Sequence, residues 1–188
     1  EPFLLIQGDF FGIQDFIFSG GSASNKGAAK ILRGRSFQVS LFTELAALKI
    51  LNVCKLPTTS QMMNAAGKFL IVAPNTEEVK NANQQVQSEL NQWFIKETYG
   101  LIGLGIAVQQ AKFSDFEEKS YEELVKKLFK NLEEQKLKRL DLTNTTQSVQ
   151  EVEYPHGVCE MNSFFPAQIG KERSVISEDQ LKIGEMLA

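Results

Sequence analysis

Asp9 is the residue best placed for chemistry in the first part of the sequence, because it follows the apolar run PFLLIQG. An aspartate at the end of a buried strand can coordinate a divalent cation that holds triphosphate oxygens. A two-metal site needs further carboxylates, so one aspartate does not make such a centre. The alternative is that Asp9 only caps the segment FFGIQDF.

A second candidate is the tight turn in NAAGKF, which separates two apolar stretches. Nucleotide cyclases carry a Gly-Gly-acid turn at such a hairpin, whereas this chain has the residues AAGK. Gly67 is most simply a turn glycine with positive φ, and Lys68 either attracts phosphate as a point charge or faces solvent. Because the acid is missing, we predict no catalytic residue and no metal site within this chain.

The basic stretch ILRGRSF is a third candidate. Arg33 and Arg35 carry planar guanidinium groups that suit phosphate or carboxylate. Ser36 is expected to be the N-cap of a helix, and the first amides of a helix attract anions. The alternatives are a solvated loop, or an arginine that pairs with a carboxylate such as Asp9 or Asp15.

Cysteine and histidine, the usual zinc ligands, are scarce. Cys159 opens the segment CEMN, but Asn162 stands where a zinc ribbon has its second cysteine, and no further cysteine pair follows. We therefore expect no zinc. His156 is the only histidine, which excludes a multi-histidine centre. The only other cysteine is Cys54, and two thiols fit a reducing cytoplasm better than a disulfide scaffold.

The composition is that of an ordinary globular protein. The 188 residues suit one large domain, or one domain with an appendage, and 43% of them are hydrophobic. The net charge of −3 argues against a general nucleic-acid binder. No apolar stretch is long enough to span a bilayer, and no signal peptide is visible. Because the sequence starts without Met in a predicted strand, we expect a domain cut from a longer, cytoplasmic chain.

Hydrophobic periodicity predicts the elements that position the candidate residues. We expect a strand, a short helix, a Gly/Ser-rich loop, a helix from Ser36, a hairpin, a helix, a strand and an amphipathic helix, at residues 2–8, 10–18, 19–30, 36–56, 61–74, 77–99, 101–113 and 120–138. Gly103 and Gly105 fall on one face of the last strand, where another element can pack closely. The charged run 117–139 is expected to face solvent.

The order of these elements predicts an α+β fold of ferredoxin-like type, with an antiparallel sheet and helices on one face. Polymerase and cyclase palm domains share this organisation. We therefore divide the chain into a palm domain at residues 1–140 and a small C-terminal appendage at residues 141–188. The appendage is expected to begin as a polar linker and to end in a helix.

Three segments together resemble a known family: GDFFGIQDFIF, GAAKILRGRSFQVSLFTELAALKIL and AAGKFLIVAPNTEE. They are similar to the first palm domain of the large subunit of type III CRISPR effector complexes, the Csm-type member of the Cas ten family. The resemblance covers most of residues 3–135. The tail resembles that family's small zinc-ribbon insertion but keeps only Cys159 of its cysteines, so we expect a degenerate ribbon without zinc.

The resemblance implies a role inside a larger protein. The family's large subunit carries an HD-type nuclease that cleaves single-stranded DNA, two palms and a helical C-terminal domain. With ATP and Mg²⁺ or Mn²⁺, the two palms make cyclic oligoadenylates once target RNA binds, and the second palm supplies a Gly-Gly-Asp-Asp turn. This chain has neither that turn nor an HD signature. The implied role is therefore half of a composite ATP site in an antiviral type III-A complex.

The resemblance also implies partners and site residues. The partners are the second palm and other domains of the parent chain, other subunits of the complex, and crRNA and target RNA indirectly, with no membrane contact. The nucleotide-binding residues are Asp9 and Phe10 at the strand end, Arg33 and Arg35 as structural or phosphate supports, Ser36 near the base or ribose, and Gly67 and Lys68 on the degenerate turn. The isolated chain is expected to be inactive. A self-sufficient GGDEF-like cyclase and a purely structural scaffold stay open as alternatives.

Overall fold

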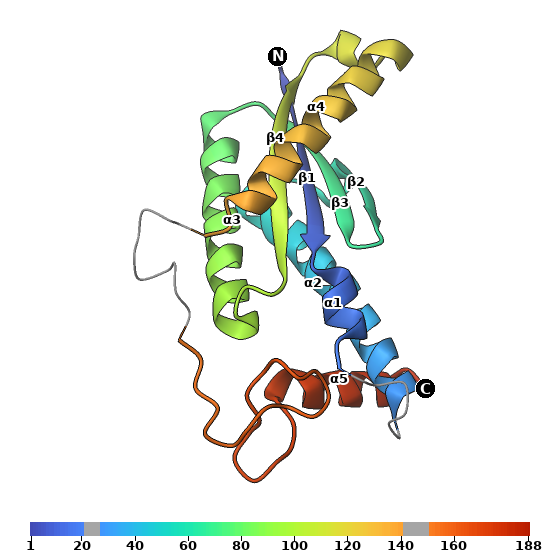
Figure 1. The fold of residues 1–188 in the computed structure, drawn as a ribbon. Helices are drawn as coiled ribbons and strands as arrows, with labels where there is room; N and C mark the ends of the chain where they lie inside the picture. Colours follow the sequence, from blue (N-terminus) through green and yellow to red (C-terminus); the bar gives the residue numbers. More distant parts are fainter. Residues whose placement is uncertain (21–26, 141–150) are drawn as a thin grey trace.

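A four-stranded antiparallel sheet lies at the centre of the computed structural model, which describes residues 1–20, 27–140 and 151–188 (Figure 1). The strands lie side by side in the order β2-β3-β1-β4. The elements in chain order are β1 (Phe3–Phe11), α1 (Ile13–Phe18), α2 (Ala28–Val53), the short 3-10 helix η2 (Thr58–Ser60), β2 (Gln61–Ala65), β3 (Lys68–Pro74), α3 (Glu77–Thr98), β4 (Gly103–Ala111), the 3-10 helix η3 (Phe113–Phe116), α4 (Glu118–Leu137) and α5 (Val175–Met186).

The succession β1, α2, β2, β3, α3, β4 is that of a ferredoxin-like fold, which confirms the predicted α+β class. β1 is a central strand and pairs antiparallel with both β3 and β4. This register places Asp9 opposite Lys68 on one side and opposite Gly105 on the other. The backbone N–H of Phe10 donates to the carbonyl of Gly67 at 2.9 Å. The end of β1 and the β2–β3 turn are therefore joined directly.

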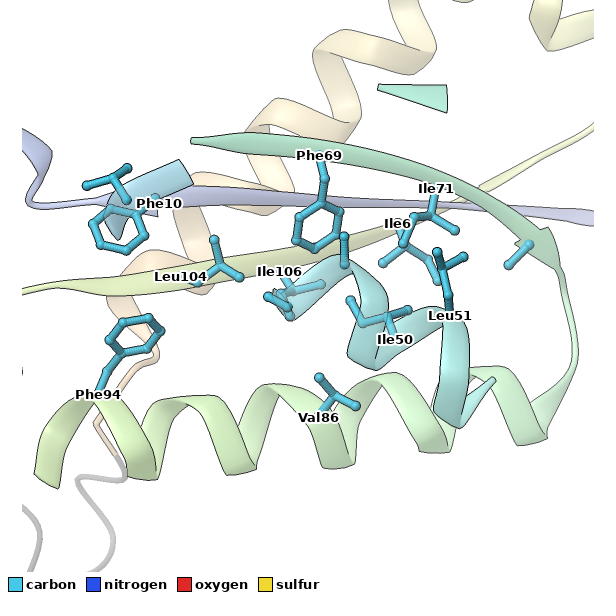
Figure 2. Close-up of a cluster of buried hydrophobic side chains, with 14 of the residues drawn as sticks. Ile6, Phe10, Ile50, Leu51, Phe69, Ile71, Val86, Phe94, Leu104 and Ile106 are labelled. Atoms are coloured by element: carbon cyan, nitrogen blue, oxygen red, sulfur yellow. The ribbon is translucent and has the colours of Figure 1, made fainter. Parts of the chain in front are cut away.

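Helices cover both faces of the sheet, whereas the sequence predicted helices on one face. α2 and α3 enclose the main core, into which side chains such as Ile6, Ile71 and Ile106 point (Figure 2). α4 crosses the opposite face (Figure 1). It closes there a second apolar cluster, formed by Leu5, Ala107, Ala111, Leu124, Leu128 and Leu132. β1 is apolar at successive positions, Leu4 and Leu5 among them, so it needs cover on both sides.

α2 begins at Ala28, well ahead of Ser36, so the predicted helix start at Ser36 is wrong. Gly27, with a φ of 108°, precedes the helix. Residues 28–30, predicted as loop, are helical because alanine and lysine favour a helix. Residues 21–26 of the predicted loop lie outside the described residues. Ser36 lies within the helix and caps nothing, so the anion site expected at a helix start here is not formed.

The C-terminal appendage packs against α2. Residues 141–150 of the predicted linker lie outside the described residues; the following segment includes a β-bridge between Val158 and Pro166 and leads into α5, the predicted terminal helix. α5 crosses α2 at two glycines, because a side chain on Gly34 or Gly184 would collide with the backbone of the other helix. The domain boundary at residue 140 stays a prediction. Among the described helices, none has the length and apolar character needed to cross a membrane.

Candidate functional site

The Asp9 carboxylate lies on the α4 face of the sheet, between two lysines. Its Oδ2 is 2.8 Å from Nζ of Lys136 and 3.7 Å from Nζ of Lys68, and its side chain is only 10% exposed. The two lysines replace the arginine partner considered from the sequence. α1 is preceded by Gly12 and has no side-chain cap, so Asp9 does not cap the segment that follows it. Asp9 is instead the anion of a nearly buried ion-pair cluster.

Lys136 is a member of this cluster that the sequence reasoning missed. Burial alone would lower the pKa of Lys136, but hydrogen bonds and charge from Asp9 and Glu133 outweigh burial and raise the pKa. Its side chain is only 20% exposed, although the charged run 117–139 was expected to face solvent. Gly105 provides the space, since a Cβ there would lie 3.0 Å from Cγ of Lys136. The one sequence feature that pointed to this contact is Gly105 itself, because a glycine inside a strand marks a place where another element packs closely.

The cluster around Asp9 does not fit the divalent cation that the resemblance implies as the companion of ATP. A cation at Asp9 would face two ammonium groups, and the turn opposite offers no second carboxylate. No group of three or more His, Cys, Asp or Glu side chains in the described part of the chain could hold a metal ion. What the cluster can do is fix the end of β1 against β3 and α4.

A groove of about 330 Å³ lies on the other side of the hairpin turn, next to α2. Its lining consists of Phe37, Ser40, Leu41, Glu44, Asn64, Ala65, Ala66 and Gly67. The φ angles of Ala66 and Gly67 are 53° and 81°, the positive values of a type I′ hairpin turn. Ser36 is exposed and lies one helical turn before Ser40, whose hydroxyl donates to the Ser36 carbonyl at 3.4 Å. Ser36 is not itself part of the lining, but it is next to Phe37 in the chain and one helical turn from Ser40, both of which line the groove.

Phe10 points into the core and is only 3% exposed. Its ring meets that of Phe94 edge-on, with ring centroids 5.8 Å apart (Figure 2). It lies nearly parallel to the ring of Phe42, at a centroid distance of 6.4 Å. A nucleotide cannot reach this ring without opening the core. Only the backbone of Phe10 takes part in the strand end, through its bond to the turn.

Arg35 is buried within the protein, with 1% of its surface exposed. Its guanidinium donates to the carbonyls of Ile17, Ser19 and Met161 at 2.7–2.8 Å and to Oε1 of Gln180 at 3.2 Å. These bonds join α1, α2 and the C-terminal appendage. Arg35 is therefore the structural support that the sequence offered as one alternative, and it is not available to a phosphate.

The remaining candidates divide between two places. Arg33 is exposed but donates to the carbonyl of Leu187 at 3.3 Å, so it also holds the appendage. Lys68 lies on the α4 face, 5.7 Å from the ring centroid of Phe129. Ser36 and the groove lie on the α2 face, and Gly67 lies in the turn between the two. The structure thus places Ser36 and Lys68 on opposite sides of the hairpin turn, so the seven residues do not line a single pocket.

The fold and this site define a ferredoxin-like α+β domain with a palm-like arrangement, in which the hairpin turn lacks an acid. A family model described as Csm1 subunit domain B matches residues 2–153. The chain belongs to this family, which confirms the resemblance found in the sequence.

Similar proteins agree with this assignment. A CRISPR system single-strand-specific deoxyribonuclease Cas10/Csm1 (subtype III-A) from Thermococcus onnurineus is 33% identical over 143 residues, which cover 74% of this chain and 18% of that protein. A Csm1–Csm4 cassette in complex with one ATP matches with a TM-score of 0.65 and 32% identity, over 73% of this chain and 19% of the other. A Csm1–Csm4 cassette in complex with cA4 matches with a TM-score of 0.67 and 28% identity, over 92% of this chain and 26% of the other. The chain thus spans between about a fifth and a quarter of the length of these relatives.

Proposed function

We propose that this chain is the first palm domain of a Cas10/Csm1-type large subunit, and that it forms half of a composite ATP site. A second palm, outside this chain, supplies the catalytic acids for cyclic oligoadenylate synthesis. The observation that carries the proposal is the pairing of Asp9 with two lysines beside a hairpin turn without an acid. Such a domain can position a nucleotide but cannot hold the metal ions that activate it.

The solved relatives support the nucleotide part of this proposal. One Csm1–Csm4 cassette is described as a complex with one ATP, and others as complexes with pppApA and cA4. In this chain we propose that the adenosine part lies at the groove beside the hairpin turn. Ser36 then contacts the base or ribose, and Gly67 allows close approach of the turn backbone. Lys68 is proposed to act on phosphate from the opposite side of the turn.

The proposed setting is a type III-A effector complex in the cytoplasm. Partners are the second palm and other domains of the parent chain, a Csm4-type subunit as in the solved cassettes, and crRNA and target RNA through other subunits. Cys54 and Cys159 are both free thiols, which suits a reducing compartment. The parent protein's nuclease activity belongs to a domain outside this chain.

A bulky charge at Ser36 tests the proposed site in the full-length parent protein. Ser36→Arg places a long side chain beside the groove without touching the core, because Ser36 is exposed on α2. We expect cyclic oligoadenylate synthesis from ATP to fall about tenfold or more, the equivalent of about 1.4 kcal/mol. The matched control is Asn81→Arg, on the exposed face of α3, which should leave the rate unchanged.

The same pair of variants distinguishes the scaffold alternative. That alternative is favoured by Phe10 and Arg35, whose side chains bind only other parts of the protein. If both variants synthesise cyclic products at the wild-type rate, the groove holds no nucleotide and the domain acts as a scaffold.

A further inference from the structure

Four buried polar side chains from two separate segments meet in the C-terminal appendage. Cys159 and Asn162 lie on a turn, and Ser174 and Ser177 lie at the start of α5. They are between 0% and 4% exposed. We call these four residues the tetrad. Their spacing, two residues between the members of each pair, is that of the two cysteine pairs of a zinc ribbon.

Direct contacts join the tetrad at its centre. Nδ2 of Asn162 donates to Oγ of Ser177 at 2.9 Å and lies 3.3 Å from Oγ of Ser174. The two serine hydroxyls are 3.2 Å apart, and Sγ of Cys159 lies 3.4 Å from Oγ of Ser177. These contacts connect all four side chains, so each buried polar group has a partner.

The observed distances are those of direct hydrogen bonds between the four side chains. The two serine hydroxyls and the Asn162 amide nitrogen lie 2.9 to 3.3 Å from one another, and Sγ of Cys159 lies 3.4 Å from Oγ of Ser177. A site of four zinc-bound thiolates, with Zn–S bonds of about 2.3 Å, would instead hold its sulfur atoms about 3.8 Å apart. The tetrad is therefore closed by hydrogen bonds made directly between its own members.

The chemistry of the donors also opposes a cation. The Oδ1 atom of Asn162 accepts hydrogen bonds from the backbone N–H groups of Phe164 and Phe165, at 3.0 and 2.9 Å. This fixes the amide so that its NH₂ group points toward the serines, with hydrogens where a cation would need lone pairs. Neutral serine hydroxyls are poor zinc ligands beside thiolate and imidazole. Only Cys159 keeps a ligand of the right kind.

We propose that the tetrad is a metal-free replacement for a structural zinc site, in which hydrogen bonds close the fold of the appendage. The closed turn presents the carbonyl of Met161 to Nη2 of Arg35, at 2.7 Å. The tetrad thereby holds the docking point of the appendage on α2. Hydrogen bonds among the four side chains join the two segments that a zinc ion would otherwise join, and the appendage folds without zinc.

Three substitutions should convert the tetrad into a zinc-binding site, since together with Cys159 they provide four thiols. The variant Asn162→Cys, Ser174→Cys, Ser177→Cys places four cysteines on the two pairs. We expect the purified chain of 188 residues to contain only substoichiometric zinc as wild type, and about one zinc per chain in the triple variant. Titration of the triple variant with Co²⁺ should give the thiolate charge-transfer absorbance of a tetrahedral site. Adding Cys159→Ser to the triple variant should weaken that signal.

Thermal unfolding of the wild-type chain is a second test, which does not depend on the folding of the triple variant. Wild-type Tm should be the same with EDTA, with added ZnCl₂ and with neither, whereas the triple variant's Tm should rise with ZnCl₂. Ser177→Ala should lower the wild-type Tm, because it removes the hydroxyl at the centre of the tetrad, while exposed Ser40→Ala should not. Stoichiometric zinc in the wild-type chain, or a wild-type Tm that EDTA lowers, would overturn the proposal.

Discussion

At the scale of single residues, Asp9 shows how a position suited to metal chemistry is used for structure instead. Two ammonium groups occupy the space around its carboxylate, so its charge is balanced within the protein. The sequence placed Asp9 just after a strand at residues 2–8, whereas β1 continues to Phe11 and includes Asp9 near its end. It could not identify Lys136, because that lysine reaches Asp9 only after α4 has folded over the sheet.

Removing the Lys136 charge should destabilise the fold. Lys136→Met keeps the aliphatic packing but leaves the Asp9 carboxylate with only the more distant Lys68. We expect the free energy of unfolding, measured with urea at pH 7, to fall by about 1–3 kcal/mol. Lys126→Met is the matched control in the same helix, because the exposed Lys126–Glu122 pair contributes at most about 0.5 kcal/mol. Equal losses in the two variants would contradict the ion-pair argument.

The pH dependence of this difference has a definite sign. The folded-state pKa of Lys136 is raised, so its stabilising contribution is complete below the unfolded-state pKa of about 10.4. The contribution is lost as pH rises through the folded-state value. The stability difference between wild type and Lys136→Met should therefore be constant between about pH 7 and 9 and should shrink above about pH 10.5.

At the scale of elements, the stretch ILRGRSF is part of the contact between α2 and α5. Gly34 lets α5 approach, Arg35 bonds to three backbone carbonyls, and Arg33 bonds to the end of the chain. The sequence predicted a helix here but started it too late. A glycine between two arginines is typical of a loop. Gly34 nevertheless lies within the helix α2, because α5 packs so closely against it that a larger residue would collide with the α5 backbone.

Replacing Arg35 should release the appendage. Arg35→Leu leaves the carbonyls of Ile17, Ser19 and Met161 without their donor, and we expect a loss of about 3 kcal/mol or more in the free energy of unfolding. Arg33→Leu, the control, removes one bond at the surface and should cost less than about 1 kcal/mol. Limited proteolysis should cut the Arg35 variant first within residues 151–174. Equal resistance of the two variants would show that Arg35 does not anchor this segment.

The remaining elements show what sequence patterns can and cannot predict. Continuous apolar runs and helical spacing of apolar residues correctly predicted β1, the hairpin, α3, β4 and α4, because each pattern reflects burial along a single element. The pattern did not reveal that α4 covers the second face, which depends on tertiary packing. Nor did it reveal Ser174 and Ser177 as counterparts of zinc-binding cysteines. Hydroxyl groups are common at helix starts, so only their contact with Asn162 distinguishes them.

At the scale of the whole molecule, the chain corresponds to only part of the length of its relatives. It spans 18% of the Thermococcus relative and 26% of a solved cassette chain that it matches over most of its own length. Its groove is open, and exposed apolar side chains such as Phe37 and Met62 lie on α2 and β2 near it. These features suit a domain whose site is completed by a neighbour.

The isolated chain should therefore make no cyclic product. Incubated with ATP and either Mg²⁺ or Mn²⁺, it should yield no cyclic oligoadenylate by mass spectrometry, because Asp9 is neutralised by lysines and the hairpin turn offers no acid to hold a metal ion. The full-length parent with its complex and target RNA is the positive control. Synthesis by the isolated chain that Asp9→Ala abolishes would instead establish a self-sufficient cyclase, and the two lysines would then have to give way to a metal ion when ATP binds.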